Sequence, residues 1–256
     1  MARVFVTGSS DGLGLMAAQL LVEQGHQVVA HGRNEQRRKE TLSSVKGAEA
    51  VLVGDLSSIA QTRKLAEEVN ALGEIDAVIH NAGVGYKEPK RIVTEDGLPR
   101  EFAVNTLAPY ILTAMIRKPR RLVYLSSGLH QNGDATLKDL KWEERRWNGT
   151  QAYSDSKLHD VMLAFAMARR WPGVLSNATE PGWVATKMGG AGAPDNLDEG
   201  HRTQVWLAVS HDPEAKASGE YFFHKKRREP NPAARRTELQ AELLAACETF
   251  SGVAMP

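Results

Sequence analysis

Residues 4–14 read Val4-Phe5-Val6-Thr7-Gly8-Ser9-Ser10-Asp11-Gly12-Leu13-Gly14. The apolar run at the start predicts a buried strand, and the pattern from Leu13 to Gln24 predicts a helix. Glycines between the two let the chain turn sharply, and the amino terminus of a helix binds phosphate groups. The spacing is neither Gly-x-Gly-x-x-Gly nor that of a P-loop, which needs Gly-Lys-Ser/Thr. The stretch favours a dinucleotide site, and a glycine-rich turn without a ligand is the alternative.

The same strand-helix alternation continues along the chain. Further apolar runs with the character of buried strands lie at 28–30, 51–53, 77–79 and 122–125, and helical patterns cover 35–44 and 59–72. Such alternation indicates a mostly parallel sheet with helices on both faces. We therefore expect a doubly wound, Rossmann-type α/β fold, with one domain spanning residues 1–256 and a ligand crevice at the carboxyl ends of the strands.

Residues with chemical potential follow these strands directly. Because the carboxyl ends of parallel strands share one edge of a sheet, we expect these side chains to lie near one another. The residues concerned are Gly8, Arg33, Asp55, Asn81, Ser127 and Pro181.

Composition excludes several classes of function. The formal net charge is +1, from 32 Lys and Arg against 31 Asp and Glu, so the whole chain does not favour a nucleic-acid partner. A basic run at 224–228 could suggest one, but Glu229 and Pro230 interrupt it, and we interpret it as a solvated surface.

The single cysteine and the amino-terminal sequence bear on the compartment. Cys247 excludes an internal disulfide, and its place on an apolar stripe within 235–250 indicates a core residue. The first strand pattern starts at Arg3, and no window approaches 18 uninterrupted apolar residues. We expect a cytoplasmic protein without a membrane partner.

Tyr153 and Lys157 form the strongest catalytic candidate. Positions i and i+4 share a helical face, so an ammonium would stand beside a phenol. A nearby cation favours the phenolate and lowers the pKa of a tyrosine, which then exchanges a proton more readily near neutral pH. Ser126-Ser127 upstream offers a hydroxyl that could orient a substrate oxygen.

The end of the second strand indicates which nicotinamide cofactor would bind. It reads His31-Gly32-Arg33-Asn34, without a carboxylate to hold a free ribose 2′-hydroxyl. A guanidinium at Arg33 suits a 2′-phosphate, which favours NADP(H) and leaves NAD(H) possible. The alternative is that Arg33 is a solvated residue at a helix start.

Together these residues resemble the short-chain dehydrogenase/reductase family. The resemblance runs from Arg3 to about Phe222 in the expected order, and the long gap between Ser127 and Tyr153 is similar to that of a retinol-dehydrogenase-like branch, here in a soluble form. The motifs that carry it are Thr7-Gly8-x-x-x-Gly12-x-Gly14, Asp55-Leu56, Asn81-Ala82-Gly83, Asn105, Ser127, Tyr153-x-x-x-Lys157 and Pro181-Gly182 with Thr186.

The resemblance implies interconversion of a ketone or aldehyde with an alcohol. In that scheme Tyr153 gives or takes the proton, Ser127 hydrogen-bonds the substrate carbonyl, Lys157 lowers the pKa of the tyrosine and holds the nicotinamide ribose, and Asn105 supports a water. Ser126 competes with Ser127 for its role, and we expect Ser126 to support the turn.

The resemblance also implies a set of cofactor-binding residues. Two of them have an alternative role, because Asp55 and Thr186 could instead cap helices. The set is Gly8, Ser10, Asp11, Gly12, Leu13, Gly14, Arg33, Asp55, Leu56, Asn81, Ala82, Gly83, Tyr153, Lys157, Pro181, Gly182, Val184 and Thr186.

The second half of the chain carries two variable segments, near 128–150 and 187–203, which we interpret as loops that wall the substrate site. Surface loops without that role are the alternative. Their tryptophans and methionine, with Trp183, suggest a medium-sized, partly apolar substrate; these residues are Trp142, Trp147, Trp183 and Met188.

Three further expectations complete the analysis. The apolar sequence at 161–168 extends beyond one helical stripe and suggests a homo-oligomer. No cluster with zinc-ligand spacing is visible, so no metal is expected. A non-catalytic sensor of dinucleotides on the same fold is the rival function, although an intact Ser, Tyr and Lys set argues against it.

Overall fold

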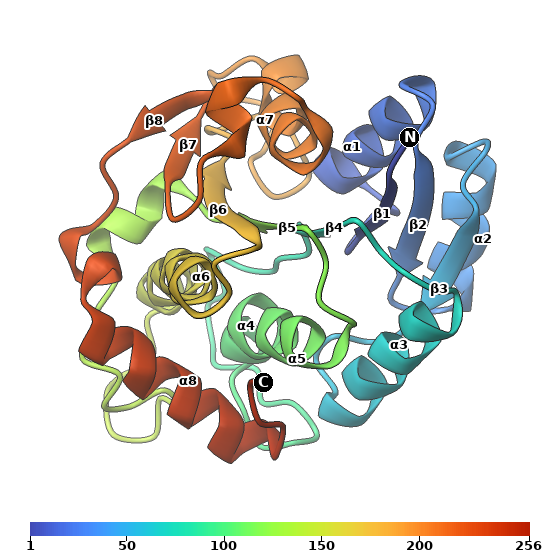
Figure 1. The fold of residues 1–256 in the computed structure, drawn as a ribbon. Coiled ribbons are helices and arrows are strands. Elements are labelled where there is room, and N and C mark those ends of the chain that lie inside the picture. Colours follow the sequence, from blue (N-terminus) through green and yellow to red (C-terminus); the bar gives the residue numbers. More distant parts are fainter.

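One sheet of eight strands runs through the centre of the molecule (Figure 1), and the computed structural model describes residues 1–256. The strand order is β3-β2-β1-β4-β5-β6-β7-β8, and every neighbouring pair is parallel except β7 with β8. The strands are β1 (Arg3–Val6), β2 (Gln27–Gly32), β3 (Ala50–Val53), β4 (Ala77–His80), β5 (Arg121–Leu125), β6 (Leu175–Glu180), β7 (Tyr221–Phe223) and β8 (Lys226–Arg228).

Helices cover both faces of this sheet (Figure 1). Helices α1, α2 and α7 pack on one face, and α3 to α6 pack on the other with α8 outside α6. The predicted doubly wound α/β fold is confirmed. The helices are α1 (Gly12–Glu23), α2 (Glu35–Ser44), α3 (Ile59–Ala71), α4 (Arg100–Phe102), α5 (Ala108–Met115), α6 (Gly149–Arg170), α7 (Leu197–Val209) and α8 (Thr237–Ser251).

Side-chain caps set the starts of most of the longer helices. Asn34 begins α2 by accepting from the Arg37 N–H, and Ser58 begins α3 by accepting from the Gln61 N–H. The same device starts α6 at Asn148. Each cap satisfies a backbone donor that has no partner inside the helix. The helix predicted at 35–44 has the bounds that α2 shows.

The predicted loop 187–203 is too long. Helix α7 begins at Leu197, because Asn196 accepts from the Asp198 N–H and two acidic residues, Asp198 and Glu199, stand in the first turn, where the helix dipole favours them. The irregular segment therefore ends at Asn196. In the other segment, α6 begins at Gly149 and a short 3₁₀ helix covers Gly128–Asn132.

The central part of helix α6 is buried on all sides by its own chain. Every residue from Val161 to Met167 is buried, and α8 packs against α6. Leu239, Leu243 and Cys247 supply the buried stripe of α8. The apolar sequence at 161–168 is thus explained by packing within one chain. It no longer argues for a homo-oligomer, which stays a prediction.

Cys247 is a core residue, as its place on the stripe predicts. It is fully buried and unpaired, and burial raises the pKa of its thiol. A neutral thiol in an apolar setting is a poor nucleophile.

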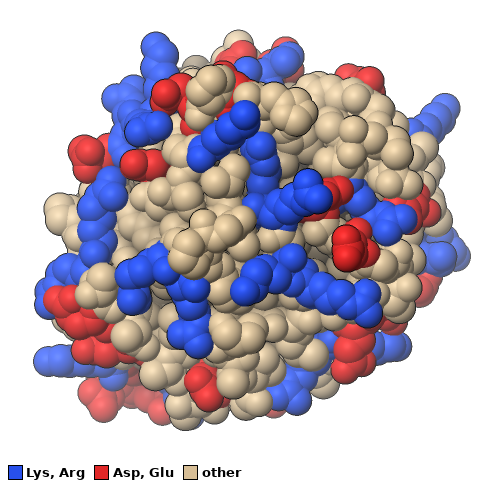
Figure 2. Space-filling model, in the orientation of Figure 1, with Lys and Arg blue, Asp and Glu red and all other residues tan.

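The surface carries both signs of charge. Figure 2 shows Lys and Arg side chains spread over one face, with Asp and Glu among them. Near β8, Arg227 forms ion pairs with Glu214 and Glu220, so part of the basic run at 224–228 is locally neutralised. No helix is long and apolar enough to cross a membrane.

Replacing Leu243 by alanine tests the packing of α8 on the rest of the core. The side chain is fully buried, so the substitution should lower the free energy of unfolding by about 2–5 kcal/mol. Leu42 on α2 is 45% exposed, and Leu42→Ala should change the free energy of unfolding by less than about 0.5 kcal/mol. Urea unfolding of both variants measures the difference; equal midpoints would contradict the packing described.

Candidate functional site

A cleft of about 960 Å³ opens at the carboxyl ends of the strands. It lies where the strand order reverses, since β1 has β2 on one side and β4 on the other. Both segments at 187–196 and 81–87 contribute to its walls. Most residues predicted for the site line it, namely Gly8, Ser10, Asp11, Gly12, Leu13, Arg33, Asp55, Leu56, Asn81, Ala82, Gly83, Ser127, Tyr153, Lys157, Pro181, Gly182, Val184 and Thr186.

Gly14 is one of two residues of the predicted catalytic and cofactor-binding set that do not line the cleft. It packs beneath the turn, where a Cβ would lie 2.2 Å from the Gly8 carbonyl oxygen and 2.3 Å from Asn81 Nδ2. Gly8 itself has φ +67°, a conformation that favours glycine. The glycines therefore let α1 approach β1 closely, and the start of α1 faces the cleft.

Hydrogen bonds from the residues that follow the neighbouring strand β4 hold this turn in place. Thr7 Oγ1 accepts from the backbone N–H groups of Asn81 and Ala82, each at 3.0 Å. In return, Asn81 Nδ2 donates to the Thr7 carbonyl at 3.0 Å and the Gly8 carbonyl at 3.3 Å. Asn81 thus fixes the backbone of the glycine-rich turn.

Two arginines line the end of the cleft beside β2. Arg33 is exposed and forms no ion pair, so its guanidinium is free for a ligand. Arg37 lies one turn further on, held by Glu40 at 2.8 Å and near Asp11 at 4.0 Å. Both cations lie where the sequence predicts a phosphate-binding group.

Asp55 lines the same end but does not cap α3. Its Oδ1 accepts from the Ser57 N–H at 2.9 Å and the Ser57 hydroxyl at 2.7 Å, while Ser58 is the cap. Thr186 does form a cap-like turn, because its Oγ1 accepts from the Gly189 N–H at 3.1 Å. Both residues still face the cleft.

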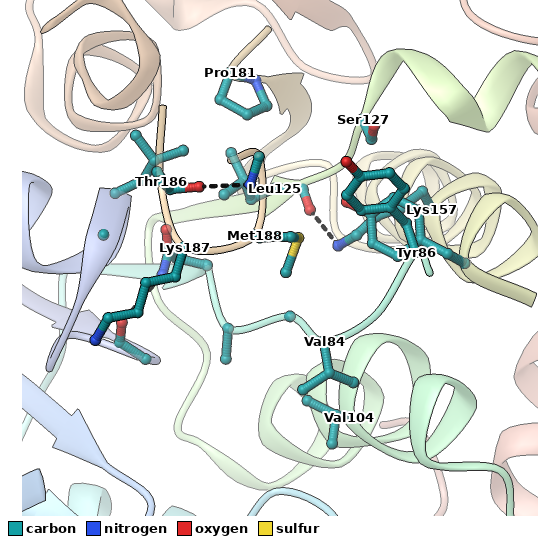
Figure 3. A pocket seen from close by; sticks show the side chains of 18 of the residues that line it. Val84, Tyr86, Val104, Leu125, Ser127, Lys157, Pro181, Thr186, Lys187 and Met188 are labelled. Atoms are coloured by element: carbon teal, nitrogen blue, oxygen red, sulfur yellow. Dashed lines mark hydrogen bonds between the residues drawn. The ribbon is translucent and has the colours of Figure 1, made fainter. Parts of the chain in front are cut away.

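Tyr153 and Lys157 stand together on the first half of α6 and line the cleft opposite α1. The Lys157 ammonium donates to the Leu125 carbonyl at 2.7 Å, which Figure 3 shows as a dashed line, and to Asp160 Oδ2 at 2.8 Å. A Cβ at Gly83 would lie 3.5 Å from Lys157 Nζ. The ammonium therefore reaches the side of the cleft that the predicted cofactor-binding residues 81–83 line, which we call the cofactor wall.

The pKa of Tyr153 differs from the sequence-based expectation. Burial raises it above its ordinary value, while the Lys157 charge and hydrogen bonding with Ser127 lower it. Asp160 and the neighbouring Tyr86 raise it further. The predicted effect of Lys157 is present, but burial outweighs it. The side chain is therefore a phenol at neutral pH.

The two serines have separate surroundings. Ser126 also lines the cleft, but it is buried and its hydroxyl donates to the Lys157 carbonyl at 2.7 Å, which ties the end of β5 to α6. Ser127 is partly exposed, caps the 3₁₀ helix at 128–132 and faces the cleft (Figure 3). This arrangement supports Ser127 as the substrate-facing hydroxyl.

Asn105 is the other predicted residue that does not line the cleft. It lies in a π-helical turn, Ala103–Leu107, and is fully buried. Its amide accepts from the Val84 N–H at 2.8 Å and donates to the Val84 carbonyl at 3.0 Å and to Ser156 Oγ at 2.9 Å. The side chain fixes the segment after β4 against α6.

Of the four residues expected to face a substrate, two line the cleft. Trp183 and Met188 line it and are 53% and 40% exposed. Trp142 and Trp147 do not line it: Trp142 is buried against Arg145 and Trp147 binds the Glu88 carbonyl. The suggestion that these two tryptophans face substrate is wrong. Trp142 packs against Arg145 of the same segment, and Trp147 donates to a carbonyl of another loop.

The sequence analysis missed several residues of the site. The Tyr86 ring lies tilted against that of Tyr153, with ring centroids 5.9 Å apart, and Glu180 lines the cleft beside Gly128. Asp160 could have been found, because a carboxylate three residues after Lys157 shares its helical face. Lys187, which pairs with Asp11 across the cleft, has no sequence signal.

Comparison with known proteins gives the class. Residues 2–196 match the short chain dehydrogenase family, so the chain belongs to that family of oxidoreductases. An uncharacterized oxidoreductase of Emericella nidulans is 47% identical over 100% of this chain and 99% of its own. The short-chain dehydrogenase chyC of Penicillium rubens is 44% identical over the whole of both chains. Retinol dehydrogenase 13 of Homo sapiens is a more distant relative, 30% identical over 99% of this chain and 85% of its own.

Solved structures show the same fold. A crystal structure of an uncharacterized protein from Mycobacterium paratuberculosis matches with a TM-score of 0.86 and 24% identity, over 100% of this chain and 95% of the other. NADPH-bound carbonyl reductase from chicken fatty liver matches with a TM-score of 0.66 and 22% identity, over 90% and 99%. The predicted Rossmann-type architecture is confirmed.

The residues present fit a nicotinamide dinucleotide. Only glycine is accommodated where α1 meets β1, and one cleft is lined both by the cations beside β2 and by the hydroxyls of Ser127 and Tyr153. The start of α1 would hold the pyrophosphate, and Lys157 would hold the nicotinamide ribose. No group of three or more His, Cys, Asp or Glu side chains that could hold a metal ion is present.

Gly14→Ala tests whether close packing shapes the cofactor turn. The added methyl group meets backbone and Asn81 at 2.2–2.3 Å, so the turn must move, at a cost of about 1–3 kcal/mol of folding free energy. NADPH affinity should fall at least about tenfold. Gly173→Ala is the matched control, because nothing lies within 4 Å of its Cβ position. Unchanged NADPH affinity in Gly14→Ala, measured by fluorescence titration, would refute this role.

Proposed function

We propose that the protein is an NADP(H)-dependent oxidoreductase that interconverts a ketone or aldehyde with an alcohol. The observation that carries the proposal is the group of Ser127, Tyr153 and Lys157 on one wall of the cleft, with a phenol and a hydroxyl free to meet one oxygen atom. Two donors aimed at one oxygen stabilise the negative charge that develops there during carbonyl reduction.

The chain supplies orientation and the proton. The bound nicotinamide would exchange a hydride with the substrate carbon. Ser127 and Tyr153 would donate hydrogen bonds to the carbonyl oxygen, and Tyr153 would then transfer its proton to that oxygen. Lys157 and Ser127 both favour the phenolate that this transfer leaves behind. Because burial raises the pKa of Tyr153, the side chain is a phenol at neutral pH and can donate its proton to the carbonyl oxygen.

The walls at the substrate end support a partly apolar substrate. Trp183, Met188 and Phe223 line this end with Val104 and Leu129. We interpret the segment 187–196 as one wall of the substrate site. In the segment 128–150, only Gly128 and Leu129 reach the cleft. The aromatic and aliphatic surface suits a ketone or aldehyde with a hydrophobic body.

Replacing Tyr153 by phenylalanine removes the proton donor and leaves the ring. Turnover of a carbonyl substrate should fall by about 10²–10⁴-fold under saturating NADPH, while NADPH binding persists. Ser127→Ala should also lose rate, and Ser126→Ala should lose less, since the Ser126 hydroxyl already donates to the Lys157 carbonyl. Near-normal reduction by Tyr153→Phe would overturn the assignment, and a larger loss in Ser126→Ala would move the role of Ser127.

The cofactor preference is tested at Arg33. One charge-assisted contact contributes about 1.5–3 kcal/mol, or roughly tenfold to a hundredfold in affinity. Arg33→Ala should weaken NADPH binding by that factor and leave NADH binding nearly unchanged, as measured by calorimetric titration. Arg38→Ala is the control, because Arg38 does not line the cleft. A wild-type protein that binds both cofactors equally would contradict the NADP(H) assignment and leave the reductase proposal standing.

A further inference from the structure

The Lys157 ammonium has three N–H donors, and the chain uses two of them. One donates to the Leu125 carbonyl at 2.7 Å and one to Asp160 Oδ2 at 2.8 Å. The third has no partner within the chain, and Nζ lies beside Gly83 on the cofactor wall of the cleft. Two fixed contacts on a flexible side chain determine the direction in which the remaining N–H points.

The pair is almost fully buried. The Lys157 side chain is 5% exposed and the Asp160 side chain is 3% exposed. An unpaired ammonium at such depth is costly, and it responds by losing its proton or turning toward water. Burial alone would lower the pKa of Lys157, yet Asp160, together with Tyr153, keeps it above the ordinary value. Burial also raises the pKa of Asp160 to about 7, against the lowering effect of Lys157. Above that pH Asp160 is mostly a carboxylate, and it then maintains both the charge and the position of the ammonium.

We propose that Asp160 is a positioning residue of this active site: its carboxylate keeps Lys157 protonated and aims its third N–H at the nicotinamide ribose. The inference rests on the proposed function. It adds a fourth side chain to the Ser127, Tyr153 and Lys157 group, acting through Lys157 and making no contact with substrate.

The titratable groups that respond to Asp160 lie on two elements. Lys157 and Tyr153 share α6 with it, and Tyr124 faces it from β5. The Tyr124 hydroxyl is bonded to Thr113 Oγ1 at 2.7 Å, and burial raises the pKa of this tyrosine, so it stays neutral. Lys157 is thus the partner whose charge depends on Asp160 at neutral and moderately alkaline pH.

Asp160→Asn tests the proposal, because it removes the charge and keeps the shape. NADPH affinity should fall about tenfold or more at pH 8, and its alkaline decline should begin at lower pH than in the wild type. Carbonyl reduction should show the same shift, since neutral Lys157 no longer supports the Tyr153 phenolate. Asp160→Glu should restore part of the affinity. Profiles of Asp160→Asn that superimpose on the wild type, in binding and in reduction, would overturn the proposal.

Asp155→Asn is the matched control. Asp155 is a buried carboxylate on the same helix, but its partner is Arg145 at 2.9 Å. If loss of any buried carboxylate from α6 disturbed the site, this variant would shift the alkaline decline equally, and that result would also count against Asp160. The proposal expects the decline of Asp155→Asn to begin at the wild-type pH.

If Asp160→Asn does not fold, a double variant that lacks both charges can be compared with a single variant instead. In Lys157→Met/Asp160→Leu both charges are absent, so no ammonium is left unpaired. Because Asp160 acts through Lys157, this double variant should bind NADPH within about twofold of Lys157→Met alone. A further large loss would show that Asp160 acts by another route. If the wild type binds NADPH but reduces no carbonyl compound, the proposed function fails while the binding series still decides the role of Asp160.

Discussion

The parallel pairing of β1, β4 and β5 is the constraint on which the site depends. It brings the turns after Val6, His80 and Leu125 to one edge of the sheet. The turns are then joined by short contacts: Asn81 binds the backbone of Thr7 and Gly8, and Lys157 binds the Leu125 carbonyl. Residues far apart in the sequence are thus held in one cleft by side-chain hydrogen bonds to backbone carbonyls.

Burial gives the cleft its chemistry. Tyr153, Lys157 and Asp160 lie on one buried stretch of α6. Charges there interact more strongly than they would in water, because the effective dielectric constant is lower. Burial favours the phenol, the ammonium favours the phenolate, and the carboxylate secures the ammonium. The balance leaves a protonated tyrosine beside a fixed cation. Such a pair is suited to give a proton to a carbonyl oxygen when charge develops on it.

Much of the fold could be predicted because its signals are local. Apolar runs marked strands β1 to β5, and the helical pattern at 35–44 marked α2. The glycine spacing and the Tyr153-Lys157 pair identified the site because both depend on short-range geometry. Signals that depend on three-dimensional surroundings were missed or misjudged. The direction in which Trp142 points, the burial of Tyr153 and the cover that α8 gives α6 are set by distant segments.

Transfer of deuterium from the cofactor to a carbonyl carbon is the decisive measurement for the proposed oxidoreductase activity. The protein would be incubated with NADPH deuterated at C4 of the nicotinamide, on the transferred face, and a series of aldehydes and ketones with hydrophobic bodies. The account predicts an alcohol that carries deuterium on the former carbonyl carbon, in an amount equal to the NADP⁺ formed. Cofactor that binds while no carbonyl compound is reduced, or an alcohol whose carbon carries no deuterium, would contradict it.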